Sequence, residues 1–307
     1  MAGRPILVVK LGALGNIVLS LNAFAAIRAY HPGARISVLT TAPYAAWLRA
    51  APWFDEVLVD GRPGWWNIPG VRRLRRMLTR PGFARVYDLQ TSGRSSYYFR
   101  LFPRRAKPEW SGIARGCSHP DLDPGRNQRH DNDRQAGQLR QAGIFAIPPA
   151  DLTWCRGDLA RFELPDGIVP LVPGSAPHRP LKRWPAAHYQ ALAEVLRRVG
   201  LTPVVLGTAA ETVLARQIPA AVDLTGKTSF GDLADIARIA RFAVGNDTGP
   251  MHLLATAGCP SLVLFSQESD PALCAPRGPK VRVLRRRDLA ALDVSSVQAE
   301  LADMAAN

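Results

Sequence analysis

The sequence predicts an α/β protein with two Rossmann-like, parallel-sheet domains that face a central cleft. Each half of the 307-residue chain opens with a short apolar run, residues 6–9 (ILVV) and 168–172 (IVPLV), which leads into a glycine-containing loop. Short apolar segments then alternate with segments of helical spacing, which is typical of parallel sheets covered by helices on both faces. A hydrophobic content of 47% supplies enough apolar side chains for two cores.

The first half begins with a buried strand, because the run at 6–9 is rich in β-branched residues and leads into a turn with Gly12 and Gly15. Helical spacing then extends from Ile17 to Tyr30 and ends before a proline and a glycine. Residues 107–149 are rich in Gly, Pro and Asp, which predicts exposed loops. The other elements expected here are strands at 36–39, 57–59 and 86–89 and helices at 71–78 and 134–142.

The second half alternates more regularly between the two kinds of segment. After the strand at 168–172, the expected strands are 203–206, 222–224, 242–244 and 261–265, and the expected helices are 185–199, 209–217, 231–239 and 250–257. We place the linker within residues 150–167. The predicted domains are therefore 1–155 and 156–307, with a C-terminal helix that can pack back on the N-terminal domain.

The loop after the expected strand 242–244 reads Gly-Asn-Asp-Thr-Gly-Pro-Met-His and leads into an apolar helix. In open α/β sheets, ligands bind beyond the carboxyl ends of the strands, which is where this loop belongs. Asp247 is the predicted N-cap, and Gly249 lets a ligand approach the backbone closely. The free first-turn amides, the Thr248 hydroxyl and His252 then form an anion site. A well-capped structural helix is the alternative interpretation.

Two further strand-end loops carry groups that complement this anion site. Ser175 and Lys182 follow the strand at 168–172, and Lys182 supplies a point charge for a diphosphate. Glu211 follows the strand at 203–206 and can accept hydrogen bonds from a ribose diol. Taken alone, Lys182 could be an ordinary surface residue. Glu211 could be an acidic residue that the helix dipole favours at a helix N-terminus. Together, the three loops predict a nucleotide-diphosphate site that needs neither a metal nor a cofactor, since we expect no Asp-x-Asp sequence to hold Mg²⁺.

With these motifs in place, the chain resembles glycosyltransferase family 9, the lipopolysaccharide heptosyltransferases. The segments that carry the resemblance are 9–17 (VKLGALGNI), 182–185 (KRWP), 246–252 (NDTGPMH), 258–260 (GCP), 264–266 (LFS) and 270–271 (DP). The resemblance implies a GT-B fold, with the acceptor on the N-terminal domain and a nucleotide-sugar donor on the C-terminal domain. It also implies inverting transfer from an ADP-heptose donor to the anionic inner core of lipopolysaccharide, with Lys182 stabilising the leaving diphosphate.

One residue departs from the family pattern. After the second glycine of the N-terminal loop, the family usually has an aspartate that resembles a catalytic base, and here the residue is Asn16. An amide cannot take a proton from an acceptor hydroxyl at neutral pH. The enzyme is then a weak one, an engineered inactive variant, or one whose base is another group, such as His130, Asp131 or Asp133. The alternative function is a catalytically weak or silent nucleotide-sugar-binding homologue.

The charge of the chain is concentrated in its first half. Of the net charge of +14, residues 1–155 carry +12 and residues 156–307 carry +2. An anionic glycolipid, an anionic membrane or a nucleic acid would match this charge, but a nucleic acid would not explain the three phosphate-oriented loops. A solvated basic surface is the simpler alternative. The residues expected to bind the acceptor are Gly15, Arg62, Arg94, Arg115 and Arg126.

The remaining sequence features concern membrane contact, cellular location and an alternative enzyme class. The basic run at 72–76 is expected to meet the anionic membrane surface or the glycolipid, unless it is only a solvated helix face. Neither a signal peptide nor a membrane-spanning helix is expected, which favours a cytoplasmic protein with peripheral contact at the inner membrane. An NAD-linked oxidoreductase is disfavoured, because residues 12–15 (GALG) lack a full GxGxxG fingerprint.

Overall fold

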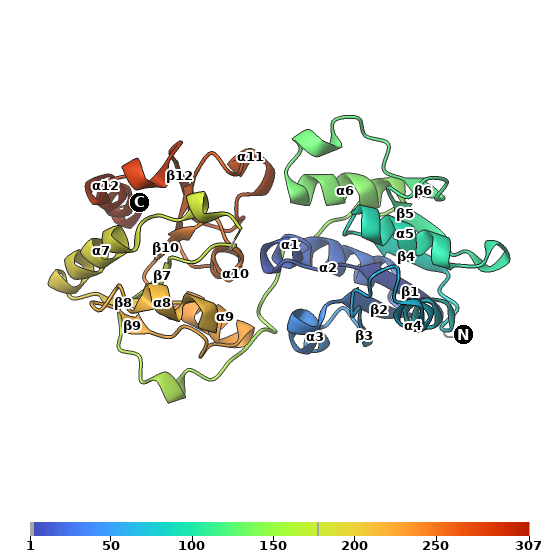
Figure 1. The fold of residues 1–307 in the computed structure, drawn as a ribbon, viewed down its shortest axis with the longest axis horizontal. Helices are drawn as coiled ribbons and strands as arrows, with labels where there is room; N and C mark the ends of the chain where they lie inside the picture. Colours follow the sequence, from blue (N-terminus) through green and yellow to red (C-terminus); the bar gives the residue numbers. More distant parts are fainter. Residues whose placement is uncertain (1–2, 177, 307) are drawn as a thin grey trace. The chain divides into compact units, whose positions relative to one another are not determined.

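A computed structural model describes residues 3–176 and 178–306. The chain divides into two compact units, Met1–Ala150 and Asp151–Asn307, so the division lies slightly before the predicted boundary at 155/156. Each unit contains a six-stranded parallel sheet with helices around it (Figure 1). Numbered along each unit, the strands of both sheets follow the order 3-2-1-4-5-6. This order is that of a Rossmann fold, as predicted.

The first unit contains the sheet β3-β2-β1-β4-β5-β6. Its strands are β1 (Gly3–Val9), β2 (Ala34–Thr40), β3 (Glu56–Val59), β4 (Arg85–Asp88), β5 (Glu109–Gly112) and β6 (His119–Pro120). Its helices are α1 (Leu14–Val18), α2 (Leu21–Tyr30), α3 (Ala42–Arg49), α4 (Ile68–Thr79), α5 (Gly93–Leu101) and α6 (Asp131–Gln141). The central strand β1 is buried from Ile6 onward, which explains its continuous apolar run.

The expected single helix from Ile17 to Tyr30 is two helices. Leu19 and Ser20 separate α1 from α2, and the Ser20 hydroxyl donates to the Asn16 carbonyl at 2.7 Å. A serine hydroxyl that bonds a preceding carbonyl competes with the regular helical pattern. The break separates the short helix that carries Asn16 from α2.

The second unit contains the sheet β12-β11-β10-β7-β8-β9. Its strands are β7 (Ile168–Val172), β8 (Thr202–Val205), β9 (Val222–Asp223), β10 (Ala243–Asn246), β11 (Ser261–Phe265) and β12 (Val281–Arg285). Its α-helices are α7 (Ala186–Arg198), α8 (Thr212–Ala215), α9 (Phe230–Ile239), α10 (Gly249–Thr256), α11 (Pro271–Cys274) and α12 (Val294–Ala306). Short 3-10 turns occur in both units, including Ala209–Glu211 directly before α8.

The C-terminal helix α12 is part of the core of the second unit. Val297, Leu301 and Met304 are buried in one cluster with Trp184 and Tyr189. The apolar face of this helix is therefore used within its own unit, and the expectation that it packs back on the N-terminal domain stays a prediction. No helix of the described residues is long and apolar enough to cross a membrane.

Candidate functional site

The predicted donor residues converge on the carboxyl edge of the second sheet. Strands β7 and β10 are neighbours, and the strand order reverses between them. Such a switch point is the usual ligand position in open α/β sheets. Ser175 and Lys182 lie in the loop after β7, Glu211 follows β8, and Asp247 begins the loop after β10. The topology thus places all three predicted loops at one edge.

Asn246, the last residue of β10, fixes the loops on both sides of this switch point. Its side-chain amide donates to the Pro173 carbonyl at 2.8 Å. Its Oδ1 accepts from the Trp184 amide at 3.0 Å and from the Tyr189 hydroxyl at 3.1 Å. Asn246 is fully buried, so these bonds satisfy a polar group that burial would otherwise penalise. The residue has a positioning role that the sequence did not indicate.

Asp247 is the centre of a polar cluster. Its Oδ2 lies 2.5 Å from Lys182 Nζ and accepts a hydrogen bond from Ser269 Oγ at 2.7 Å, and its Oδ1 lies 3.8 Å from His252 Nε2. Burial raises the pKa of Asp247, but its interactions with His252, Lys182 and Ser269 outweigh burial and lower that pKa to about 2. The cluster therefore holds a buried carboxylate ionised. Ser269, in the loop after β11, was not predicted.

The start of α10 differs from the prediction. Its N-cap is Thr248 and not Asp247, and the Thr248 side chain makes no capping hydrogen bond. The reason is that Lys182 and Ser269 engage the Asp247 carboxylate instead. A helix whose first amides lack a side-chain cap presents donors and a positive dipole end to an anion. In addition, His252 Nδ1 is buried without a partner among the described residues.

Ser175 and Glu211 are both held by local bonds at this edge. The Ser175 hydroxyl accepts from Arg183 Nε at 3.0 Å and lies 3.1 Å from the Arg179 carbonyl. Glu211 accepts from the Thr208 amide at 2.7 Å, which completes a capping box. A Cβ added at Gly174 would lie 2.8 Å from Glu211 Cγ. The glycine thus lets Glu211 approach the loop after β7.

The first unit presents Asn16 on α1, beyond the carboxyl end of β1. Asn16 is exposed, whereas Gly15 beside it is buried. The turn before α1 needs Gly12, whose φ of +118° lies in the region that favours glycine and whose added Cβ would be 2.6 Å from Tyr44 Cε2. The glycine loop therefore exposes an amide side chain at the position where the family resemblance implies a catalytic base.

Two of the predicted acceptor arginines lie around the loop after β3. Arg62 donates to the Leu11 carbonyl at 3.3 Å, and Arg94 donates to the Pro63 carbonyl at 3.3 Å. Buried Asp60 accepts from the Arg62 amide at 2.8 Å and from the Tyr98 hydroxyl. Burial and this bond to Asp60 raise the pKa of Tyr98 well above its ordinary value.

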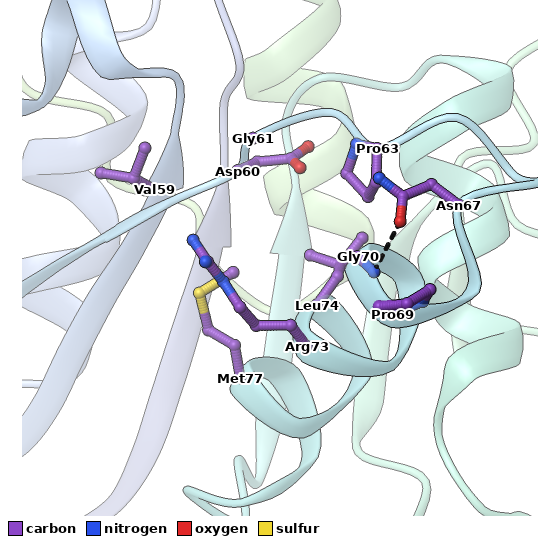
Figure 2. Close-up of a pocket in the computed structure, with 10 residues that line it drawn as sticks. All are labelled: Val59, Asp60, Gly61, Pro63, Asn67, Pro69, Gly70, Arg73, Leu74 and Met77. Carbon is purple, nitrogen blue, oxygen red and sulfur yellow. Dashed lines mark hydrogen bonds between the residues drawn. The ribbon is translucent and has the colours of Figure 1, made fainter.

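A pocket of about 320 Å³ lies between this loop and α4. Figure 2 shows Arg73 and Met77 extending from α4, with Asp60 on the loop after β3. The residues that line this pocket are Val59, Asp60, Gly61, Pro63, Asn67, Pro69, Gly70, Arg73, Leu74 and Met77. The loop that carries Arg62 is therefore also one wall of a pocket.

The other two predicted acceptor arginines lie elsewhere in the first unit. Arg115 is exposed in the loop after β5. Arg126 pairs with Asp121 at 2.7 Å, and its side chain is only 15% exposed. The structure thus groups Arg62 with Arg94 and leaves Arg126 committed to a local ion pair.

The switch point of the first sheet, between β1 and β4, holds a buried cation and a buried carboxyl that the sequence did not indicate. Lys10 Nζ donates to the Leu89 carbonyl at 3.0 Å, and Asp88 accepts from the Thr91 amide at 3.0 Å. Burial lowers the pKa of Lys10 to about 8 and raises that of Asp88 to about 7. Asp131, one of the alternative bases, lies close enough to raise the Lys10 pKa in part.

The first half contains two Asp-x-Asp sequences, at residues 121–123 and 131–133, and both form ion pairs with arginines. Asp121 pairs with Arg126, Asp123 with Arg129 at 2.8 Å, and Asp131 with Arg134. Residue His130 is the N-cap of α6, where its side chain accepts from the Asn132 amide. Within residues 3–176 and 178–306, no group of three or more His, Cys, Asp or Glu side chains is arranged to hold a metal ion.

Comparison with known proteins finds a matching family model and similar curated proteins. The family model described as glycosyltransferase family 9 (heptosyltransferase) matches residues 71–301. Lipooligosaccharide heptosyltransferase 2 of Haemophilus influenzae is 32% identical over 127 residues, which are 38% of this chain and 36% of that protein. The chain is thus matched to about a third of that relative's length. Lipopolysaccharide heptosyltransferase 2 of Salmonella typhimurium is 26% identical over 313 residues, covering 91% of this chain and 87% of that protein.

Solved structures share the fold along nearly the whole chain. A family 9 glycosyltransferase from Veillonella parvula matches with a TM-score of 0.84 at 20% identity, covering 98% of this chain and 97% of that one. The Escherichia coli ADP-heptose heptosyltransferase II matches with a TM-score of 0.79 at 22% identity, covering 98% of each chain. The Escherichia coli heptosyltransferase WaaC with ADP matches with a TM-score of 0.74 at 21% identity, covering 98% of this chain and 100% of that one. The predicted GT-B class, with two Rossmann-like domains, is confirmed.

Proposed function

Because the chain belongs to glycosyltransferase family 9, the heptosyltransferases, we propose that it transfers heptose or a related sugar from an ADP-sugar to the anionic inner core of lipopolysaccharide. The transfer inverts the configuration at the anomeric carbon and uses no metal ion. The observation that carries the proposal is the Asp247 cluster beside the uncapped start of α10. The solved relatives named for ADP-heptose or bound to ADP support the choice of donor.

In the proposed reaction, the second unit stabilises the departing diphosphate. Negative charge develops there as the sugar leaves, and preorganised donors lower the barrier when they are directed at that charge. The donors are the amides of Thr248 and Gly249 at the start of α10 and His252 Nδ1, which has no partner among the described residues. An ammonium carries three donors, so Lys182 can bind Asp247 through one and phosphate through the others. Glu211 accepts from the ribose, and Ser175 shapes the loop.

Replacing Lys182 tests this donor site. We expect Lys182→Ala to lower donor affinity or turnover by at least about tenfold, since a charge-assisted bond to phosphate is lost. Calorimetric titration with ADP-heptose and a turnover assay measure the two effects, and EDTA should leave wild-type turnover unchanged. The matched control is Lys227→Ala, an exposed lysine of the same unit that bonds the Asp223 carbonyl. Wild-type kinetics for Lys182→Ala would exclude the phosphate role.

The acceptor is proposed to bind the first unit, through Gly15, Arg62, Arg94, Arg115 and Arg126. The strongest support is for Arg62 and Arg94, because both border the loop after β3 at the carboxyl edge of the sheet. Arg126 would first have to share its charge with Asp121. A cytoplasmic location with peripheral contact at the inner membrane completes the proposal.

A second candidate function is a nucleotide-sugar-binding homologue with weak or no turnover. The observation that favours it is Asn16, an exposed amide at the position of the family's base. If another group is the base instead, the candidates are His130, Asp131 and Asp133. Titration with ADP-heptose, followed by an assay with a Kdo-lipid acceptor, separates the two functions: binding without turnover identifies the silent homologue.

A further inference from the structure

Helix α4 and the chain around it form the most basic part of the first unit. Residues 61–108 contain twelve Lys and Arg residues and one acidic residue, the buried Asp88. Leu74 and Leu78 anchor α4 in the core. On the opposite face, a row of exposed residues repeats at the four-residue spacing that places side chains along one line of a helix. The row consists of Ile68, Arg72, Arg76 and Arg80.

The turn that precedes α4 holds large apolar side chains in solvent. Trp66 is 87% exposed and Ile68 is 58% exposed. The turn is built by Asn67, whose amide donates to the Gly64 carbonyl at 2.8 Å and whose side chain accepts from the Gly70 amide at 3.0 Å (Figure 2). A Cβ at Gly64 would lie 2.5 Å from the Trp66 ring, so the ring lies close against this turn. The tryptophan is therefore presented to solvent by a turn with its own hydrogen bonds.

We propose that this surface, consisting of Trp65, Trp66, Ile68, Arg72, Arg76 and Arg80, docks the protein on an anionic phospholipid bilayer. The apolar face of α4 is used in the core, so the membrane contact is made by Trp66 and Ile68 at the start of the helix and by the arginine row on its outer face. The ring of Trp66 enters the headgroup region, where tryptophan is favoured, and the arginines meet lipid phosphates. A second copy of the chain is the poorer occupant, because two such surfaces would bring like charges together.

The docking surface is continuous with the predicted acceptor residues. The rings of Trp65 and Tyr97 lie 4.3 Å apart, and the Arg94 guanidinium lies 4.8 Å above the Trp65 ring. Arg94 also bonds the Pro63 carbonyl, at the base of the same turn. If the acceptor is a glycolipid, as the proposed function states, docking through Trp66 brings Arg62 and Arg94 to the membrane that holds it.

Vesicle flotation tests the docking directly and needs no donor or acceptor. The full-length protein should float with vesicles of phosphatidylglycerol and phosphatidylcholine, and not with phosphatidylcholine alone. The triple variant Arg72→Gln, Arg76→Gln, Arg80→Gln should partition about 100-fold less, at roughly one kcal/mol of attraction per arginine. Trp66→Ser should partition about tenfold less, because the loss of one interfacial ring removes part of the buried apolar area.

Matched variants separate docking from general effects of charge and exposure. Phe145→Ser removes another exposed aromatic ring of the first unit, 74% exposed, and should bind vesicles as wild type does. A second triple variant removes the same charge from the second unit and should also bind normally; it carries Gln at Arg197, Arg198 and Arg216, all exposed. Equal losses in test and control variants, or equal flotation with both kinds of vesicle, would overturn the proposal.

Turnover distinguishes failure of the docking from failure of the proposed function. With a deacylated, water-soluble acceptor, Trp66→Ser should match wild type, while turnover of the same acceptor embedded in vesicles should fall with vesicle binding. If the wild-type protein floats with anionic vesicles but does not transfer sugar to either acceptor, docking is supported and the enzymatic proposal is refuted. If sedimentation shows a wild-type dimer that Trp66→Ser dissociates, the surface is a protein contact and the membrane proposal is wrong.

Discussion

Asp247 is buried, yet its carboxylate remains ionised because hydrogen bonds outweigh the cost of burial. Its pKa is about 2 in the folded chain against an ordinary value of 3.8. A carboxyl group whose folded pKa is lowered contributes stability that is present above pH 4 and is lost as the pH falls from about 4 to 2. The contribution is on the order of 2 kcal/mol.

We therefore expect Asp247→Asn to flatten the acid limb of the stability profile. The free energy of unfolding in urea, measured from pH 7 down to pH 3, should fall less steeply for the variant than for wild type. Asp166→Asn, an exposed carboxyl of the same unit, is the control and should leave the profile unchanged. Parallel profiles for wild type and Asp247→Asn would show that the cluster does not hold the carboxylate ionised.

Asn16 is the residue on which turnover depends in our proposal. Asn16→Asp supplies a carboxylate at the position of the family's base, and general-base catalysis typically contributes about 10²–10⁴-fold. We expect kcat to rise by at least about tenfold, with little change in donor affinity, in an assay with ADP-heptose and a Kdo-lipid acceptor. Asn16→Ala, which removes the amide without adding a base, should not raise kcat. If Asn16→Asp binds donor without any gain in kcat, the base is another residue.

At the scale of secondary structure, tight packing connects the start of α9 to the chain that enters the second unit. A Cβ at Gly231 would lie 2.0 Å from the Arg156 carbonyl oxygen, which is a backbone atom that cannot move without shifting the chain. The Gly157 amide in turn donates to the Asp235 carboxylate, also on α9, at 2.6 Å. The linker is thus part of the folded second unit from Arg156 onward.

We expect Gly231→Ala to destabilise the second unit by about 2 kcal/mol, because overpacking against backbone forces a local shift. Thermal unfolding followed by circular dichroism measures the effect. Gly137→Ala, within α6 where an added Cβ meets nothing within 4 Å, should instead stabilise the chain by about 0.5–1 kcal/mol. If both variants behave alike, the close contact at Gly231 has no energetic consequence.

Elements with strong apolar periodicity could be predicted from the sequence, and elements built by local polar bonds could not. The strand Ser261–Phe265 agrees residue for residue with its apolar run. In contrast, α5 is a polar segment that begins with a capping box between Ser92 and Ser95. The edge strand β12 combines three apolar residues with two arginines, and β6 contains only two residues. These three elements depend on neighbours that hydropathy does not reveal.

The candidate site shows the same limit. The loops after β7, β8 and β10 could be placed together because parallel strands end at one edge of a sheet. The partners of Asp247 could not, since Lys182 and Ser269 are 65 and 22 residues away in the sequence. The assignment of Asp247 as a helix cap was wrong for this reason: local spacing favoured capping, while distant side chains engaged its carboxylate.

At the scale of the whole molecule, the two compact units predict an uneven response to ligand. If ADP binds the edge of the second sheet, saturating ADP at about 100 times its Kd should stabilise that unit by about 2.7 kcal/mol. Hydrogen exchange measured by mass spectrometry should then slow mainly in peptides from residues 168–270, while peptides from residues 3–150 change less. Lys182→Ala should weaken this protection at the same ADP concentration. Protection confined to the first unit would place the nucleotide there and refute the donor assignment.

Each of the two sheets is completed within one half of the chain, and no strand of the described residues crosses from one half to the other. Recombination near residue 150 therefore interrupts no strand pairing and leaves both hydrophobic cores with their own residues. Under the proposed division of roles, a chimera that keeps residues 1–150 and takes its second half from a relative would inherit the sugar-nucleotide preference of that relative. Acceptor choice and donor choice can thus diversify as separate modules, each through a single crossover.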